Sequence, residues 1–151
     1  MIRIFLVGAP VMVLCLMLQA FFVALCLRHY ERFGISPTHK FTLIRNILPL
    51  AAVMLIMTVG SLFQVAIWAA LFILLGEFDR AEASLYYSAV NFSTLGYGDI
   101  VMSDRWRLLG PLEAFNGILM FGVSTALMSA TVNRVLRQAA AWRERHPDGG
   151  I

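Results

Sequence analysis

One stretch near the middle of the chain decides the fold: Thr94-Leu95-Gly96-Tyr97-Gly98-Asp99. Successive carbonyl groups of an ordinary strand alternate sides, so several in a row face one axis only where the backbone alternates between right- and left-handed conformations. Glycine tolerates the left-handed region, and Gly96 and Gly98 stand at alternate positions. The stretch predicts a column of backbone oxygens with the Thr94 hydroxyl at its inner end and the Leu95 and Tyr97 side chains turned away. An oxygen-only lining suits a hard cation.

This stretch resembles the selectivity filter of the tetrameric potassium channels, whose signature is Thr-x-Gly-Tyr-Gly, usually with Asp next. Residues 85–93 resemble that family's pore helix, because an aromatic pair is followed by a serine and then by a hydroxyl residue just before the filter. The resemblance implies that K⁺ binds to backbone oxygens of the first four filter residues and to the first hydroxyl, the filter being Thr94, Leu95, Gly96, Tyr97 and Gly98. The alternative for a bare Gly-x-Gly is a tight turn. One pore loop per chain cannot close a ring around an ion, so the resemblance also implies a homotetramer.

Composition places the chain in a bilayer. It has 151 residues, of which 60% are hydrophobic and 14% charged, and this is too apolar for a soluble domain of that size. The apolar runs 4–27, 47–75 and 108–132 each exceed the roughly 20 residues needed to cross about 30 Å of hydrocarbon. Residues 85–93 are too few to cross and fit a re-entrant helix. We predict an all-α membrane protein with three transmembrane helices, a re-entrant pore helix and a filter loop.

These signals divide the chain into four parts. We predict an N-terminal transmembrane helix at 1–28, a cytoplasmic linker at 29–46, a pore domain at 47–134 and a short basic cytoplasmic tail at 135–151. The pore domain is expected to contain an outer helix at 47–76, a pore helix at 80–93, the filter at 94–99 and an inner helix at 108–134. The resemblance covers the pore domain, so the first helix is an addition to its two-helix core.

Charge predicts the orientation, because basic residues favour the cytoplasmic side. They gather between the first two spans and after the last: Arg28, Arg32, Lys40 and Arg45, then Arg134, Arg137, Arg143 and Arg145. We therefore expect a multi-pass protein of the cell (inner) membrane with its N-terminus outside, its C-terminus inside and its filter loop outside. Acidic residues exceed basic ones in that loop, which would favour cations at the mouth. The net charge of +3 reflects topology and gives no case for nucleic acid.

The first span has a second interpretation, because Leu18-Gln19-Ala20 could end a signal peptide. A membrane anchor is favoured, since the apolar run is too long for a usual signal core and its removal would place the filter on the wrong side. The span has no ladder of arginines, which argues against a voltage sensor. Its two cysteines, Cys15 and Cys26, are expected to be apolar packing residues.

Several residues around the filter are expected to support it. Tyr86 and Tyr87 match the family's aromatic positions, so the resemblance assigns them to buttress Tyr97, with Tyr87 also within reach of Asp99; plain core packing is the alternative. Val90 stands where some members carry a carboxylate that pairs with the aspartate after the filter, so Asp99 must find another partner. Leu95, where the family has Val or Ile, implies a repacked wall behind the filter.

The start of the pore helix carries a capping pattern. Asp79 is expected at the N-cap with Glu82 three residues later, as in a capping box. The other end of that helix would direct the negative end of its dipole toward the pore centre, where a dehydrating cation needs stabilisation.

The inner helix carries further candidates. Residues 121–125 resemble the family's hinge region, and Gly122 is the hinge candidate, with close helix packing as the other explanation. The same alignment places three modest side chains along the cavity: Val123, Ala126 and Ala130. Glu113 is either a support of the filter from behind or an interfacial carboxylate. Trp106 is expected at the outer interface.

The sequence thus favours passive, potassium-selective conduction. Two alternatives remain: a nonselective monovalent cation channel, if Leu95 deforms the filter, and a nonconducting assembly subunit that keeps the fold. A transporter subunit with four filter-like loops in one long chain fits less well. No catalytic constellation or phosphate-binding loop appears, so neither an enzyme nor an organic cofactor is expected, and the partners are further copies of the chain and membrane lipids. Three histidines could sense pH or could simply be solvated: His29, His39 and His146.

Overall fold

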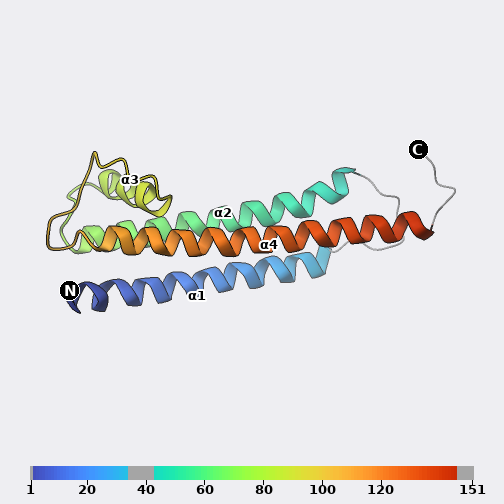
Figure 1. The fold of residues 1–151 in the computed structure, drawn as a ribbon, viewed down its shortest axis with the longest axis horizontal. Coiled ribbons are helices and arrows are strands. Elements are labelled where there is room, and N and C mark those ends of the chain that lie inside the picture. Colours follow the sequence, from blue (N-terminus) through green and yellow to red (C-terminus); the bar gives the residue numbers. More distant parts are fainter. Residues whose placement is uncertain (1, 34–42, 146–151) are drawn as a thin grey trace.

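The structure is a computed structural model that describes residues 2–33 and 43–145, all of whose regular elements are helices. These are α1 (Ile2–Phe33), α2 (Leu43–Leu74), α3 (Ala81–Phe92) and α4 (Leu109–Arg145). Three long helices lie alongside one another, and the short α3 lies against one end of α2 and α4 (Figure 1). The prediction of an all-α chain with one short helix among three long ones is confirmed. His39, Lys40 and His146 lie outside the described residues.

The long helices are able to cross a membrane. Their apolar segments are Ile2–Arg28, Leu50–Leu74 and Leu109–Arg137, with 27, 25 and 29 residues. At about 1.5 Å per residue each is longer than the roughly 30 Å hydrocarbon layer, whereas the 12 residues of α3 cover only about 18 Å. The chain is therefore a multi-pass membrane protein with three candidate spans, and α3 is too short to be a fourth.

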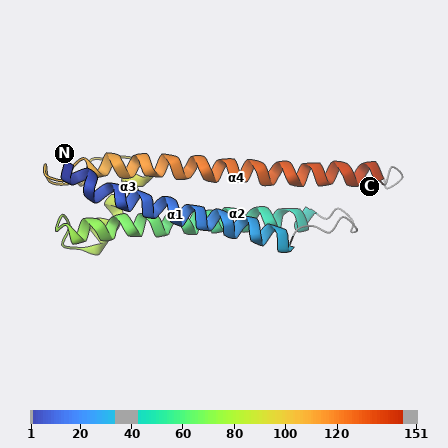
Figure 2. The same cartoon turned by 90° about the horizontal axis from the view of Figure 1, so that it is seen from below.

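The course of the chain brings the N-terminus to the same end as α3. α1 runs away from that end, α2 returns to it and α4 leaves it again (Figures 1 and 2). Three helix ends differ from the predicted ones by four residues or more: α1 continues to Phe33 instead of 28, α2 starts at Leu43 instead of 47, and α4 continues to Arg145 instead of 134. The added turns of α4 are rich in alanine, leucine, glutamine and arginine, which have high helix propensity.

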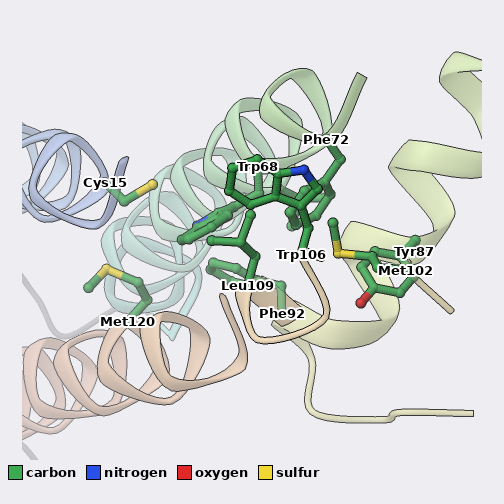
Figure 3. Packing of buried hydrophobic residues seen from close by; sticks show 10 residues of the cluster. Cys15, Trp68, Phe72, Tyr87, Phe92, Met102, Trp106, Leu109 and Met120 are labelled. Carbon is green, nitrogen blue, oxygen red and sulfur yellow. The ribbon is translucent and has the colours of Figure 1, made fainter. Parts of the chain in front are cut away.

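An aromatic core lies where α3 meets the ends of α2 and α4 (Figure 3). The Tyr87 ring lies edge-on to Phe72, with ring centroids 5.4 Å apart. Trp106 is buried in this core, and its place at the outer membrane interface stays a prediction. The segment between the filter and α4 folds back over the core and carries Trp106 inward, while the guanidinium of Arg105 covers its ring at 5.3 Å.

The first helix is packed into the molecule along its length. A Cβ added at Gly8 would overlap the side chain of Leu112 on α4, and one added at Gly60 on α2 would lie 2.9 Å from Cδ2 of Phe22. Small residues at such points let helices approach closely. Cys15 and Cys26 are buried and free, which confirms the prediction that they are packing residues. α1 is also continuous through residues 18–20.

Candidate functional site: the filter loop and its supports

The short helix α3 starts without the predicted capping box. Its N-cap is Arg80, which has extended backbone angles and no side-chain hydrogen bond to the helix. Asp79 is therefore one residue too early to cap it. Glu82 accepts a hydrogen bond from the Arg80 guanidinium at 2.7 Å instead of capping the helix start. The capping prediction is wrong because the helix begins one residue later than the sequence pattern suggests.

The filter stretch begins where α3 ends. The backbone N–H groups of Leu95 and Gly96 both donate to the carbonyl of Val90, at 2.9 and 3.3 Å. Thr94 donates to the carbonyl of Asn91 at 2.8 Å. The first half of the filter is therefore tied to the last turn of α3, and the position of that helix sets where the filter starts.

The filter backbone alternates in handedness. Thr94, Gly96 and Gly98 have φ values of +61°, +56° and +74°, and the intervening Leu95 and Tyr97 do not have positive φ. The expected left-handed conformation at both glycines is confirmed. Thr94 was not expected to share it, and a β-branched residue in that region is strained. Alternation of this kind turns successive peptide groups to one side, as the oxygen column requires.

Asp99 at the outer end of the filter is bound by Tyr86 and not by Tyr87. The Tyr86 hydroxyl donates to Oδ2 of Asp99 at 2.8 Å. This hydrogen bond is the main reason why the pKa of Tyr86 lies above its ordinary value. Tyr87 turns into the aromatic core, and burial raises its pKa. Tyr86 is thus the hydrogen-bond partner of Asp99, in place of the carboxylate that some members of the tetrameric potassium channel family carry at the position of Val90.

The loop that leaves the filter is fastened to the loop before α3. Both the backbone N–H and the hydroxyl of Ser103 donate to the carboxylate of Glu77, each at 2.7 Å. Asp104 accepts a hydrogen bond from Arg107 at 3.1 Å. Several acids of the predicted vestibule therefore also have structural partners.

Glu113 lies between α4 and α3 in the interior of the chain. It is fully buried, and its carboxyl group is hydrogen-bonded to the Ser88 hydroxyl on α3. The interpretation as an interfacial carboxylate is therefore wrong, because α4 turns this side chain toward α3 and α2. Ser84 and Ser88, one turn apart, also donate to carbonyl oxygens of α2, at 2.7 Å to Ala69 and 2.8 Å to Val65.

Sequence reasoning missed one glycine that positions α3. A Cβ added at Gly117 on α4 would overlap the carbonyl oxygen of Phe92, the last residue of α3, and would lie 2.9 Å from its carbonyl carbon. The end of the pore helix therefore rests on the backbone of α4. The available signal was its spacing, since Gly117 is one turn after Glu113 on a helix face that also carries Asn116 and Met120, both buried.

The hinge candidate lies elsewhere on α4. The helix is continuous through Gly122, and a Cβ added there would meet no atom of the described chain within 4 Å. Close packing within one chain therefore does not explain this glycine. Val123, Ala126 and Ala130 are exposed as well, so their predicted place along a cavity stays a prediction.

Two spanning helices that enclose a short helix and an extended return segment make up the arrangement of a pore-loop membrane protein. A comparison with protein families agrees: a family described as "Ion channel" matches residues 58–134, slightly more than half of the chain. The chain belongs to this ion channel family, which is not a family of enzymes. No curated protein and no solved structure matches the chain.

Proposed function

We propose that this ion channel conducts K⁺ passively and selectively. The observation that carries the proposal is the alternation of positive φ through Thr94, Gly96 and Gly98 directly after a short helix. A backbone of this handedness can present consecutive carbonyl oxygens to one axis, and rings of such oxygens can replace the hydration shell of K⁺. The proposed ligands are four backbone oxygens and one hydroxyl, from Thr94, Leu95, Gly96 and Tyr97.

The assembly proposed is a homotetramer, because one chain supplies only one side of the oxygen column. Its support is the exposure of large side chains beside the filter. Leu95 and Tyr97 are 54% and 67% exposed in the single chain, and Tyr86 is 40% exposed. Neighbouring copies would cover these side chains around a common axis. Mass spectrometry of the intact protein in detergent tests the proposed copy number.

The orientation proposed has the N-terminus and the filter outside and the C-terminus in the cytoplasm. Its support is the common end of the molecule shared by the start of α1 and the filter loop, together with the basic residues near the other end. Within this arrangement Gly122 is the proposed hinge, and Val123, Ala126 and Ala130 are the proposed cavity lining. Reporter fusions to either terminus test the orientation.

A matched pair of glycine substitutions tests the function. Gly98 and Gly76 have the same φ of +74°, and a Cβ added to either meets no atom within 4 Å. Alanine therefore adds similar backbone strain at both sites, about 1–2 kcal/mol. Only Gly98 belongs to the filter, so Gly98→Ala should abolish the preference for K⁺ over Na⁺ while Gly76→Ala keeps it.

The measurement is K⁺ and Na⁺ flux into liposomes that contain the purified protein. Equal permeation of the two ions by the wild type would favour a nonselective cation channel, and no flux would favour an assembly subunit. Wild-type selectivity in Gly98→Ala would contradict the assignment of the filter.

A further inference from the structure

The hydrogen bonds of Ser88, in the buried contact between α3 and α4, indicate which group carries the proton between Ser88 and Glu113. The single hydroxyl of Ser88 lies 2.8 Å from the carbonyl oxygen of Val65 and is also hydrogen-bonded to Oε1 of Glu113. A hydroxyl donates one hydrogen bond, and the Val65 carbonyl can only accept. If the Ser88 hydroxyl donates to Val65, then the proton between Ser88 and Glu113 belongs to the carboxyl group. The relay runs from α4 through α3 to α2.

The surroundings of Glu113 favour this neutral form. The side chain is fully buried, and its second oxygen has no hydrogen-bond partner among the described residues. Neither of the ion pairs Arg80–Glu82 and Arg107–Asp104 includes Glu113, and the side chain hydrogen-bonded to its carboxyl group is the neutral Ser88. A buried carboxylate without compensation is very unfavourable, and it is more so inside a bilayer.

Residues from every helix surround this group. Among the described residues, Cys15 of α1 and Tyr87 of α3 are titratable side chains close enough to Glu113 to interact electrostatically with it, and neither can supply a positive charge. Cys15 also interacts with Asn116 of α4 and Trp68 of α2, whose polar atoms are buried. Figure 3 shows Cys15 and Trp68 reaching the same core from α1 and α2. Cys15 of the first helix thereby helps to shield the buried Glu113 side chain from water.

The relay acts on the part of α3 that holds the filter. Ser88 lies two residues before Val90, whose carbonyl binds the backbone N–H groups of Leu95 and Gly96. A shift of α3 relative to α4 would therefore move the start of the filter. Helix α3 is also held here by the hydrogen bond from the Ser84 hydroxyl to α2 and by the close approach of Phe92 to Gly117.

We propose that Glu113 is a positioning residue of the filter, and that it acts as a neutral acid which donates its proton to Ser88 and so fixes α3 between α2 and α4. The expected effect of Glu113 on the selectivity for K⁺ over Na⁺ rests on the proposed function, whereas the protonation state of Glu113 does not. Glutamine can replace a neutral acid as a hydrogen-bond donor of similar size. A leucine at position 113 has a similar volume and cannot donate a hydrogen bond to Ser88.

The first measurement is the infrared spectrum of the tetramer or other native assembly in lipid at neutral pH. A carboxylic acid band is expected in the wild type and should be lost in Glu113→Gln. The control is Glu82→Gln, because the Glu82 side chain is 81% exposed and is paired with Arg80. This control should keep the band. A wild-type spectrum with only ionised carboxylates would overturn the proposal whether or not the protein conducts K⁺.

The second measurement is the ratio of K⁺ to Na⁺ flux in liposomes. Glu113→Gln should retain the wild-type ratio, while Glu113→Leu should lower it by roughly tenfold, as expected for the loss of a buried hydrogen bond. Should the leucine variant fail to assemble, Ser88→Ala removes the same relay and should lower the ratio likewise. A glutamine variant as impaired as Ser88→Ala would contradict the role of a neutral donor. If the wild type is itself unselective, the proposed function fails and the infrared result still decides the protonation state.

Discussion

Gln19 of α1 accepts a hydrogen bond from Gln64 of α2, with 2.8 Å between Oε1 and Nε2. Both side chains are buried, with 2% and 0% of their surfaces exposed. The amide nitrogen of Gln19 also lies 3.4 Å from the hydroxyl of Ser124 on α4. The Gln19 side chain of the first helix therefore connects α2 and α4. Its contact on α4, Ser124, lies two residues after the hinge candidate Gly122. Buried amide pairs of this kind join helices inside a membrane.

Removing this bridge should weaken the fold. Gln19→Leu leaves the Gln64 amide buried without its acceptor, so we expect the free energy of unfolding to fall by about 0.5–2 kcal/mol. The double variant Gln19→Leu/Gln64→Leu should recover part of that loss, because no unpaired amide remains. Unfolding in mixed detergent, followed by circular dichroism, measures both effects. Thr58→Val is the control, since the Thr58 hydroxyl donates to the carbonyl of Met54 on its own helix and joins no second helix among the described residues.

Two glycines on α4 should respond oppositely to alanine. Gly117→Ala places a Cβ against backbone atoms of Phe92, which cannot turn away, and should cost about 1–3 kcal/mol. Gly122→Ala meets no atom and removes a flexible residue from a helix, so it should be neutral or stabilising by about 0.5–1 kcal/mol. Thermal unfolding separates the two variants. A Gly122→Ala protein of normal stability and altered open probability would support the hinge, and normal gating would argue against it.

The bond between Tyr86 and Asp99 should depend on alkaline pH. The pKa of Tyr86 is raised chiefly by this hydrogen bond, so the stabilisation is complete below the ordinary tyrosine pKa of about 10 and is lost as the pH rises through the higher folded value. Tyrosinate absorbance should therefore show late titration of the buried Tyr87 and also of Tyr86. Asp99→Asn, which removes the negative charge, should bring the titration of Tyr86 back toward the ordinary range, and Tyr86→Phe should remove it from the spectrum. An unchanged titration in Asp99→Asn would refute the assignment.

The outer loop should loosen without Ser103. Ser103→Ala removes one of the two hydrogen bonds to Glu77. Glu77→Gln replaces one of the two acceptor oxygens with an NH₂ group and removes the negative charge from the other. We expect faster trypsin cleavage after Arg105 or Arg107 in both variants, because a less constrained loop fits a protease better. Asp104→Asn is the matched control. It disrupts only an exposed ion pair with Arg107, which contributes little to stability, and should leave the cleavage rate nearly unchanged.

Local features of the chain were predictable from the sequence. The positive φ of Gly96 and Gly98 follows from residue type, and the three long helices follow from the lengths of apolar runs. The position of α3 followed from a motif, although its first residue did not. Local preference favours Asp79 as the N-cap, and the folded chain starts the helix one residue later, after Arg80. The family assignment at residues 58–134 agrees with the resemblance seen in the filter.

Partners across the molecule were not predictable in the same way. Nothing in the order of residues indicated that Tyr86 and not Tyr87 would bind Asp99, since neighbouring residues on a helix face different directions and the packing of α3 selects one. Gln19 appeared only as part of a possible cleavage site, and its role depends on a helix docking beside α2 and α4.

The sequence by itself determined the left-handed conformation of Gly96 and Gly98 and the number of segments long enough to span a bilayer, because the first depends on residue type and the second on run length. Tertiary structure alone decided the burial of Glu113 against Ser88, the contact of Gly117 with Phe92 and the place of the first helix. These contacts join residues that are far apart in the chain, and they form only when side chains of several helices fill one space together.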